Sequence, residues 1–307
     1  MGGIALLRSI QKNGRFKYNL ISFSFFGPSF LIYSAFFIVP SIMGFLYSFT
    51  SWNGISSKMK FVGLDNYIEI FKDDRFYHTI ANTLIITVIQ VIFFNFFALF
   101  LAAILERTIN KTVKSTLRSL YFFPYIISYV IIAVIWNYML NFRDGIINQI
   151  LRSAGLDFLA ADWLGSPGLV IFTISAINIW AFIGFYLVIY MASIQAIPDH
   201  LFESCHIDGC GFIKVMRYVI FPLVAPAFTV NMVISVAWGL STFEPILILT
   251  KGGPGFASET ISYYVYWSGF LGSRQGYGTA ISFLLFVITL MISIFQVKVL
   301  QKKEVEF

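Results

Sequence analysis

A polar segment between two long apolar runs carries the most distinctive residues of this chain. The segment covers 197–222 and holds Glu203, Asp208 and Gly209 ahead of Pro222. A carboxylate such as that of Glu203 forms strong, charge-assisted hydrogen bonds with a cationic group of another protein. Gly209 permits a tight reversal because glycine has no Cβ, and Asp208 is placed to tie down that turn. These residue types indicate a polar helical hairpin between two spans, either one that protrudes toward a partner protein or an ordinary amphipathic loop that caps the two spans.

Two short helices are expected within this hairpin. Pro198 and Asp199 form a start signal for the first helix, with Asp199 expected to cap its first backbone amides. Gly211 adds a second glycine to the reversal. Phe212 follows it and is expected to pack back against the membrane-embedded helices.

The same hairpin contains two cysteines, Cys205 and Cys210, with His206 between them. A structural zinc site takes four ligands, and no second pair of cysteines or histidines follows at zinc-site spacing. The sequence therefore predicts no metal site. We interpret the cysteines as reduced thiols. Ser204 and Cys205 follow Glu203 as small side chains, which allows close docking.

The elements that hold this hairpin are predicted to cross a membrane. Hydrophobic residues make up 58% of the 307 residues and charged residues 12%, whereas soluble domains carry about 25% charged residues. A helix needs about 20 apolar residues to cross the hydrocarbon core. The charge-free runs predict an all-α membrane protein with six transmembrane helices, at roughly 21–49, 80–105, 118–140, 169–196, 222–249 and 279–299.

The distribution of basic residues predicts the orientation. Of 21 Lys and Arg residues, 13 lie on the side of the 197–217 hairpin and eight lie on the other side. Because cytoplasmic segments carry the excess of Lys and Arg, both termini and the hairpin are expected to be cytoplasmic.

The first apolar run is too long for a cleavable signal peptide. We expect a cytoplasmic tail at 1–20, a single transmembrane domain at 21–300 and a second tail at 301–307. The basic residues are too dispersed for a nucleic-acid surface.

Several separated motifs resemble those of one known family. The Glu203-Ser204-Cys205 run, followed by Asp208-Gly209 and Pro222, resembles the "EAA" coupling loop of bacterial ABC importer permeases. Ser204 and Cys205 stand where that loop has two alanines. The stretches GLDNYIEIF at 63–71, Asn82-Thr83, and LTKGGPGFASETISYYVYWSGF at 249–270 resemble elements of the carbohydrate-type permeases in this family.

This resemblance implies a type I ABC importer permease fold in a bacterial inner membrane. It implies that the chain is not an enzyme and holds no cofactor, since ATP and Mg are bound by a partner ATPase. The implied partners are a second homologous permease subunit, a dimer of ATP-binding cassette ATPases, and an extracellular or periplasmic solute-binding protein. The residues implied to couple transport to the ATPase are Glu203, Ser204, Cys205, Asp208, Gly209 and Gly211.

The resemblance also implies a substrate path on the spans that flank the hairpin. The implied lining residues are Asn178, Phe182, Phe185, Ser235, Trp238 and Glu244. Amide, hydroxyl and carboxyl groups suit sugar hydroxyls, and the aromatic rings suit the apolar face of a sugar ring. Packing or lipid contact is the alternative for the aromatic residues, and an ion pair to a neighbouring subunit is the alternative for Glu244. Both Ser235 and Glu244 can line one cavity only where Gly239 or Pro245 interrupts the helix.

The predicted function is therefore import of a carbohydrate, most simply an oligosaccharide or glycoside. Glycerol phosphate or another small polar solute is the alternative cargo. A stand-alone secondary transporter would require inverted repeats and intramembrane ion or proton groups, and a single intramembrane carboxylate, Glu244, with no visible repeat fits it poorly. A membrane enzyme would require clustered His, Asp or Glu side chains. No glycine-rich phosphate loop with a following Lys-Ser or Lys-Thr is present.

Overall fold

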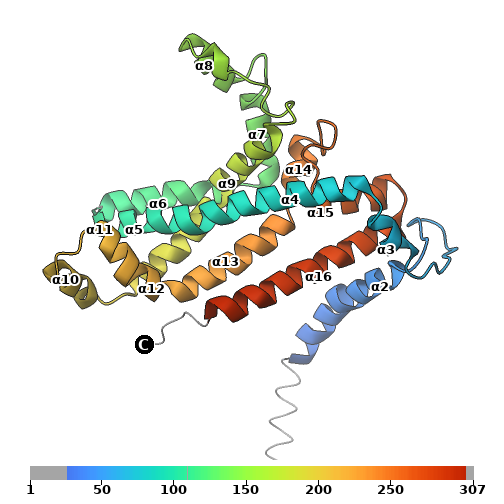
Figure 1. Ribbon diagram of the computed structural model, residues 1–307, viewed down its shortest axis with the longest axis horizontal. Coiled ribbons are helices and arrows are strands. Elements are labelled where there is room, and N and C mark those ends of the chain that lie inside the picture. The colour runs from blue at the N-terminus through green and yellow to red at the C-terminus, as the bar shows by residue number, and fades with distance from the viewer. Residues whose placement is uncertain (1–25, 109, 302–307) are drawn as a thin grey trace, which may run out of the picture.

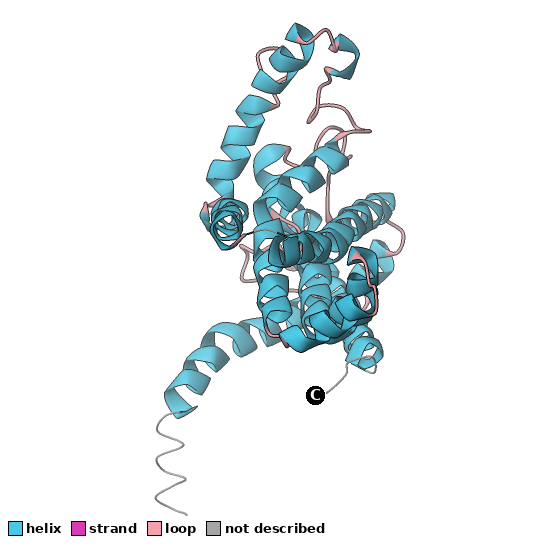
Figure 2. Ribbon diagram, turned by 90° about the vertical axis from the view of Figure 1, so that its left-hand side faces the viewer, coloured by secondary structure: helices cyan, strands magenta, loops and turns pink. Residues whose placement is uncertain are grey.

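The computed structural model describes residues 26–108 and 110–301, which are almost entirely helical (Figures 1 and 2). Among these residues the only β contact is an isolated bridge between Thr50 and Phe61. The expected tail at 1–20, the start of the first predicted span and residues 302–307 lie outside the described residues.

Five helices of the described chain are long and apolar enough to cross a bilayer. They match the first, second, fourth, fifth and sixth predicted spans, and they are Phe26–Tyr47, Asp74–Arg107, Val170–Gln195, Ala225–Leu249 and Gln275–Leu300. Several contain π-helical or broken sections. Their labelled parts are η1 (Ser34–Ile38), α2 (Val39–Tyr47), α4 (Asp74–Ile92), η2 (Phe93–Phe97), α5 (Ala98–Thr108), α9 (Val170–Gln195), α13 (Ala225–Leu240), α14 (Glu244–Leu249) and α16 (Gln275–Leu300).

Shorter helices connect these spans. They are α3 (Asp65–Ile70), α8 (Ile146–Ser153), η3 (Asp157–Leu159), α10 (Asp199–Ile207), α11 (Phe212–Val215), η4 (Met216–Ile220), α12 (Phe221–Leu223), α15 (Ile261–Tyr266) and η5 (Trp267–Leu271).

The third predicted span is not one straight helix. It consists of α6 (Lys111–Ile126) and α7 (Tyr129–Met139), which meet at an angle of 97°. Pro124 has no N–H to donate to the preceding turn, and the helix ends two residues after it. Ile127 and Ser128 then adopt extended ψ angles of 138° and 133°. The expectation of a continuous helix over 118–140 was therefore wrong, although the two helices together are apolar enough for one broken span.

The long helices lie side by side, with α9 at the centre of the packing. α5 and α6 both pack along α9, and α6 approaches it backbone to backbone at Gly184. A Cβ on Gly184 would lie 2.1 Å from the carbonyl oxygen of Tyr121, so only glycine fits there. Small residues at such contacts are typical of membrane helices, which gain little from hydrophobic burial and depend on close packing.

The two ends of the bundle differ. The hairpin end carries the segment 197–223, at the left of Figure 1, and the loop end carries the segments 48–73 and 250–274, at the right. α7 and α8 project sideways from the bundle in both views. In an apolar stretch of 18 residues within α9, 61% of the residues are buried, whereas none are buried in the equivalent stretch of Phe26–Tyr47. The first span is therefore a peripheral helix of this chain.

Candidate functional site

The predicted hairpin is formed by α10 and α11, joined by a short turn. Gly209 has the positive φ that the sequence predicted, at 71°. The N–H of Cys210 donates to the carbonyl of Cys205 at 2.9 Å, and the N–H of Gly209 donates to the carbonyl of His206 at 3.0 Å. These two bonds define a Schellman motif, which ends a helix with a left-handed residue. Gly211, at φ −74° and ψ 172°, has a backbone conformation open to any residue.

The start of α10 differs from the expectation. Pro198 occupies the N-cap position, and Asp199 is the first helical residue with no side-chain hydrogen bond to the helix amides. Asp199 therefore does not cap the helix, but its negative charge in the first turn interacts favourably with the helix dipole. Asp208 is an exposed residue at the C-terminal end of α10. Its side chain makes no hydrogen bond within the described residues, so the turn is held by backbone bonds instead.

The hairpin has a buried face and an exposed face. Phe202, Cys205 and Val215 belong to a core cluster with Leu105 of α5 and Ile194 of α9. The exposed face carries the other five predicted coupling residues, which are Glu203, Ser204, Asp208, Gly209 and Gly211. Glu203 makes no ion pair within the described part of the chain, and its carboxylate is free for an external cation.

Cys205 lies on the buried face of the hairpin rather than on its exposed face. Its thiol contacts the thiol of Cys210, and this contact together with burial raises the pKa of Cys205 to about 11. The thiol is therefore protonated at neutral pH and is a poor nucleophile. The contact follows from the Schellman motif, because the residues four before and one after its left-handed position commonly touch.

Arg107, at the end of α5, holds α10 against the bundle. Its guanidinium lies 3.6 Å from the ring centroid of Phe202 and 3.7 Å from a carboxylate oxygen of Asp199. Asp199 is 88% exposed, and such an ion pair contributes about 0–1 kcal/mol. The contact with the buried ring of Phe202 is the more important of the two.

A buried carboxylate braces the same end of the bundle. Glu106 accepts from Lys114 Nζ at 2.7 Å and from Gln195 Nε2 at 2.8 Å, which ties α5 to α6 and α9. Neither this group nor Arg107 was identified as functional from the sequence. The available signal was a charged pair at the end of an apolar span.

A cleft of about 380 Å³ lies in the bundle, and we call it the Glu244 cleft. Four of the six predicted path residues line it, namely Asn178, Phe182, Trp238 and Glu244. Phe185 packs against Trp238 with ring centroids 5.4 Å apart but does not line the cleft. The full lining is Gln90, Phe94, Asn178, Phe182, Trp238, Ser241, Thr242, Phe243, Glu244 and Pro245.

A break in the fifth span brings Glu244 to the cleft. α13 ends at Leu240 and α14 begins at Glu244. Pro245 lacks an N–H for the preceding turn, which accounts for the break. Either Gly239 or Pro245 was predicted to be the residue that could interrupt the helix, and Gly239 remains inside α13. Glu244 was expected to be a buried carboxylate, but it is exposed at this break and has no ion pair within the described residues.

Ser235 does not line the Glu244 cleft. It is fully buried and accepts a hydrogen bond from Asn95 Nδ2 at 2.9 Å. Asn95 belongs to the π-helical section η2 and also accepts from the hydroxyl of Tyr190 at 2.9 Å. Asn231, one turn before Ser235, is fully buried beside the Tyr190 hydroxyl, and neither of its amide atoms has a partner of good hydrogen-bond geometry in the described chain. A buried polar layer thus joins α9, η2 and α13.

Gln90 and Thr242 are cleft residues that sequence reasoning missed. Gln90 stands in the second predicted span, where a polar side chain among apolar ones was the available signal. Asn178 was predicted correctly as a lining residue. It also has a local partner, because its Oδ1 accepts from the hydroxyl of Tyr129 at 2.5 Å.

A second network fixes the loop end. Arg75 donates to both carboxylate oxygens of Glu259 at 2.7 Å, and Glu259 is fully buried. Asn82 Nδ2 donates to the carbonyl of Glu259 at 3.0 Å, and the N–H of Ile261 donates to Thr83 Oγ1 at 3.0 Å. The Asn-Thr pair and the GGP-containing segment, separated by over a hundred residues, are therefore parts of one structure.

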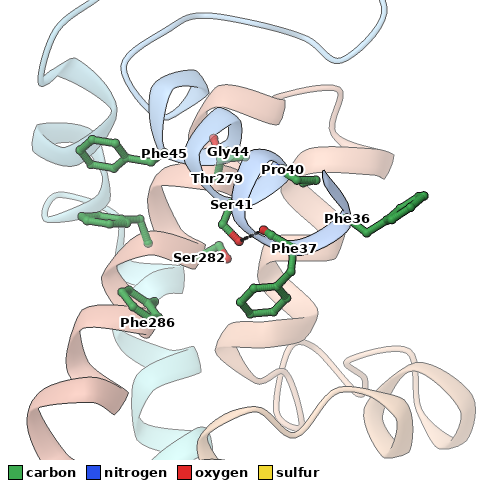
Figure 3. Close-up of a pocket in the computed structure, with 10 residues that line it drawn as sticks. Phe36, Phe37, Pro40, Ser41, Gly44, Phe45, Thr279, Ser282 and Phe286 are labelled. Carbon is green, nitrogen blue, oxygen red and sulfur yellow. Dashed lines mark hydrogen bonds between the residues drawn. The ribbon is translucent and has the colours of Figure 1, made fainter. Parts of the chain in front are cut away.

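A larger cleft, of about 550 Å³, lies between the first span and α16 (Figure 3). Aromatic rings dominate its lining. The hydroxyl of Ser41 donates a hydrogen bond to the carbonyl of Phe37 at 2.7 Å. Its remaining polar side chains are the hydroxyls of Thr279 and Ser282. An apolar cleft beside a peripheral helix suits lipid or another helix better than a polar cargo.

A bundle of apolar spans with a polar helical hairpin at one end and a partly polar cleft between the spans is the architecture of an integral membrane permease. The chain belongs to the family of binding-protein-dependent transport system inner membrane components, whose model matches residues 95–305. The predicted family is thereby confirmed, and the family is one of transport permeases, not enzymes.

Individual relatives support this assignment. The probable ABC transporter permease protein YurN of Bacillus subtilis is 32% identical, over 91% of this chain and 95% of the relative. The probable starch degradation products transport system permease protein AmyD of Thermoanaerobacterium thermosulfurigenes is 32% identical, over 95% and 97%. A crystallised bacterial ABC transporter that imports the acidic polysaccharide alginate contains a chain of the same fold, with TM-score 0.85, 24% identity, and coverage of 95% and 99%. The predicted importer permease fold is confirmed.

Proposed function

We propose that this chain is one of two permease subunits of an ATP-driven importer for a carbohydrate. The observation that carries the proposal is the hairpin of α10 and α11, whose inner face is buried in the bundle and whose outer face presents an unpaired Glu203. An element rigidly seated on one side and unpartnered on the other suits the transmission of movement from a separate ATPase.

The proposed mechanism follows the contacts of α9. Ile194 and Ile197, at its hairpin end, pack in the cluster that contains Phe202. Asn178 and Phe182, nearer the middle of α9, line the Glu244 cleft. A displacement of α10 by the ATPase would reach the cleft through this one helix. The ion pair of Glu106 and Lys114, whose side chains are 5% and 23% exposed, resists independent movement of the surrounding helix ends.

The proposed partners complete features that this chain holds only in part. A second, related permease would close the Glu244 cleft, which is open in this subunit. A dimer of ATP-binding cassette ATPases would supply ATP and Mg binding and would engage the hairpin. An extracellular or periplasmic binding protein would deliver the cargo at the loop end. The hairpin and both termini would then lie in the cytoplasm.

A carbohydrate is the cargo that the lining of the cleft favours. Amide, hydroxyl and carboxyl groups can each bond a sugar hydroxyl, and the rings of Phe182 and Trp238, 6.1 Å apart and steeply inclined, offer apolar walls. The relative named for starch degradation products adds support for an oligosaccharide.

The substitution Glu203→Arg tests the coupling role. In the assembled complex we expect binding of the loaded binding protein to persist and stimulated ATP hydrolysis to fall at least about tenfold, because a cation replaces the acceptor of a charge-assisted bond. Asp157→Arg, an exposed charge reversal outside the hairpin, is the control and should behave as wild type. Wild-type stimulation in Glu203→Arg, or uptake by the purified chain alone in liposomes, would contradict the proposal.

A further inference from the structure

Gln90 is a buried amide on the wall of the Glu244 cleft. It lies on α4, is 3% exposed and lines the cleft together with Asn178 and Glu244. Its Nε2 atom has no hydrogen-bond acceptor within the described residues. Leaving a buried polar group without a hydrogen-bond partner costs free energy. A hydrogen bond that the Gln90 amide forms only with bound cargo accounts for the presence of this residue in the cleft wall.

The charge of the cleft is one-sided. Among the ten residues that line it, all of which the structure describes, Glu244 is the only one with a charged side chain, and none is Lys or Arg. The basic residue at the start of the same α4 helix, Arg75, is already bound to Glu259. An anionic cargo would therefore meet a carboxylate in a partly apolar cleft, and like charges brought together in this way are strongly unfavourable.

We propose that the cleft selects an uncharged saccharide, that Gln90 is a specificity-determining hydrogen-bonding residue for it, and that Glu244 both accepts from its hydroxyls and excludes anionic cargo. This inference rests on the proposed carbohydrate transport. A sugar hydroxyl can donate to the Glu244 carboxylate and accept from the Gln90 amide, while the rings of Phe182 and Trp238 contact its C–H groups. A uronate offers the same hydroxyls but adds a carboxylate.

Direct binding to the permease complex tests the inference independently of selection by the binding protein. The complex of both permeases and the ATPases, in nanodiscs without binding protein, is titrated with neutral trisaccharides, among them maltotriose and raffinose, and with trigalacturonate. Saturation-transfer NMR suits such weak binding. Uptake of the same sugars into proteoliposomes is measured with the complete system.

Gln296→Leu is the matched control for Gln90→Leu. Gln296 lies on α16, away from the cleft lining, and its Oε1 atom is also buried without a partner in the described chain. We expect Gln90→Leu to weaken binding of the preferred neutral trisaccharide by about three- to tenfold, the effect of one lost hydrogen bond, and Gln296→Leu to leave it unchanged. Glu244→Gln should reduce the preference for neutral over acidic trisaccharides.

Each outcome decides a different part. Equal binding by Gln90→Leu and Gln296→Leu would overturn the role of Gln90, and equal wild-type binding of trigalacturonate would overturn the charge selection. Uptake of saccharides that do not bind the complex in nanodiscs would place recognition outside the cleft and leave the proposed function standing. Absence of uptake for every saccharide, with an intact complex, would overturn the carbohydrate assignment and this inference with it.

Discussion

At the scale of single residues, two glycines only two positions apart have different roles. Gly209 has a φ of 71°, which residues with a Cβ adopt only at a cost. Gly211 has an ordinary extended conformation, and a Cβ there would meet no atom within 4 Å. Both were expected to enable the reversal, but only Gly209 does so. Residue type alone does not separate the two, because glycine is compatible with every backbone region.

The pair provides a test with its own control. Gly209→Val forces a β-branched residue into the left-handed region at a cost of about 1–3 kcal/mol, so the turn after α10 should rearrange and displace Glu203. We expect assembled complex that retains binding-protein contact but loses most of the stimulated ATP hydrolysis. Gly211→Ala should hydrolyse ATP as wild type does. Equal activity of both variants, measured on complexes of equal purity, would show that the shape of the turn is unimportant.

At the scale of elements, the π-helical section η2 within the second span places Asn95 in the middle of a buried polar layer. Asn95 bonds both Ser235 and Tyr190, which links three helices inside the apolar bundle. Such single-turn widenings of an α-helix frequently occur at functional sites. Hydropathy does not reveal them, since the inserted turn changes the register of the helix and not its composition.

Asn95 and Asn231 are predicted to respond oppositely to the same substitution. Asn95→Leu removes the acceptor of the Tyr190 hydroxyl and the donor to Ser235, whose own hydroxyl still donates to Met232, and it should lower the stability of the complex by about 1–3 kcal/mol. Asn231→Leu removes an amide that lies beside the Tyr190 hydroxyl but has no hydrogen bond of good geometry in the described residues, and its stability should be equal or higher. Thermal unfolding of the purified complexes measures both. A comparable loss in Asn231→Leu would mean that its amide has a partner, such as a buried water.

The spans themselves could be predicted well because one physical cause determines them. A run such as 169–196 must be apolar to cross the bilayer, and the helix Val170–Gln195 matches it closely. The break at Ile127 and the exposure of Glu244 depend on local backbone geometry around prolines, where an interrupted helix and a kinked one have the same composition. Four of the six path residues meet in one cleft, whereas Ser235, one turn before Trp238 on α13, is buried against Asn95 of η2 and does not line it.

At the scale of the whole molecule, contacts between distant segments join the loop end into one unit. Asp73 accepts hydrogen bonds from the hydroxyls of Tyr264 and Tyr277. Burial opposes the charged form of Asp73, but these bonds prevail and lower its pKa. The carboxylate therefore contributes stability above the unfolded-state pKa of about 3.9, which is lost as the pH falls through the lower folded-state value. Such pairings were beyond the sequence, because no local pattern relates residues so far apart.

Among the contacts of the loop end, the ion pair of Arg75 and Glu259 is expected to cause the largest loss of stability when it is broken, because it is shielded from solvent. Glu259 is fully buried and Arg75 is 18% exposed by its side chain, so Glu259→Gln leaves a poorly hydrated guanidinium without its counter-charge. We expect a loss of about 3 kcal/mol or more, seen as a lower melting temperature of the assembled complex. The pair of Glu69 and Arg274 serves as the control, since its side chains are 51% and 48% exposed and Glu69→Gln should change stability by less than about 1 kcal/mol.

The double substitution Arg75→Met and Glu259→Leu should recover much of the lost stability, because it removes both charges together. Equal effects of Glu259→Gln and Glu69→Gln would show that water reaches the buried pair, and the loop end would then be held by its hydrogen bonds alone.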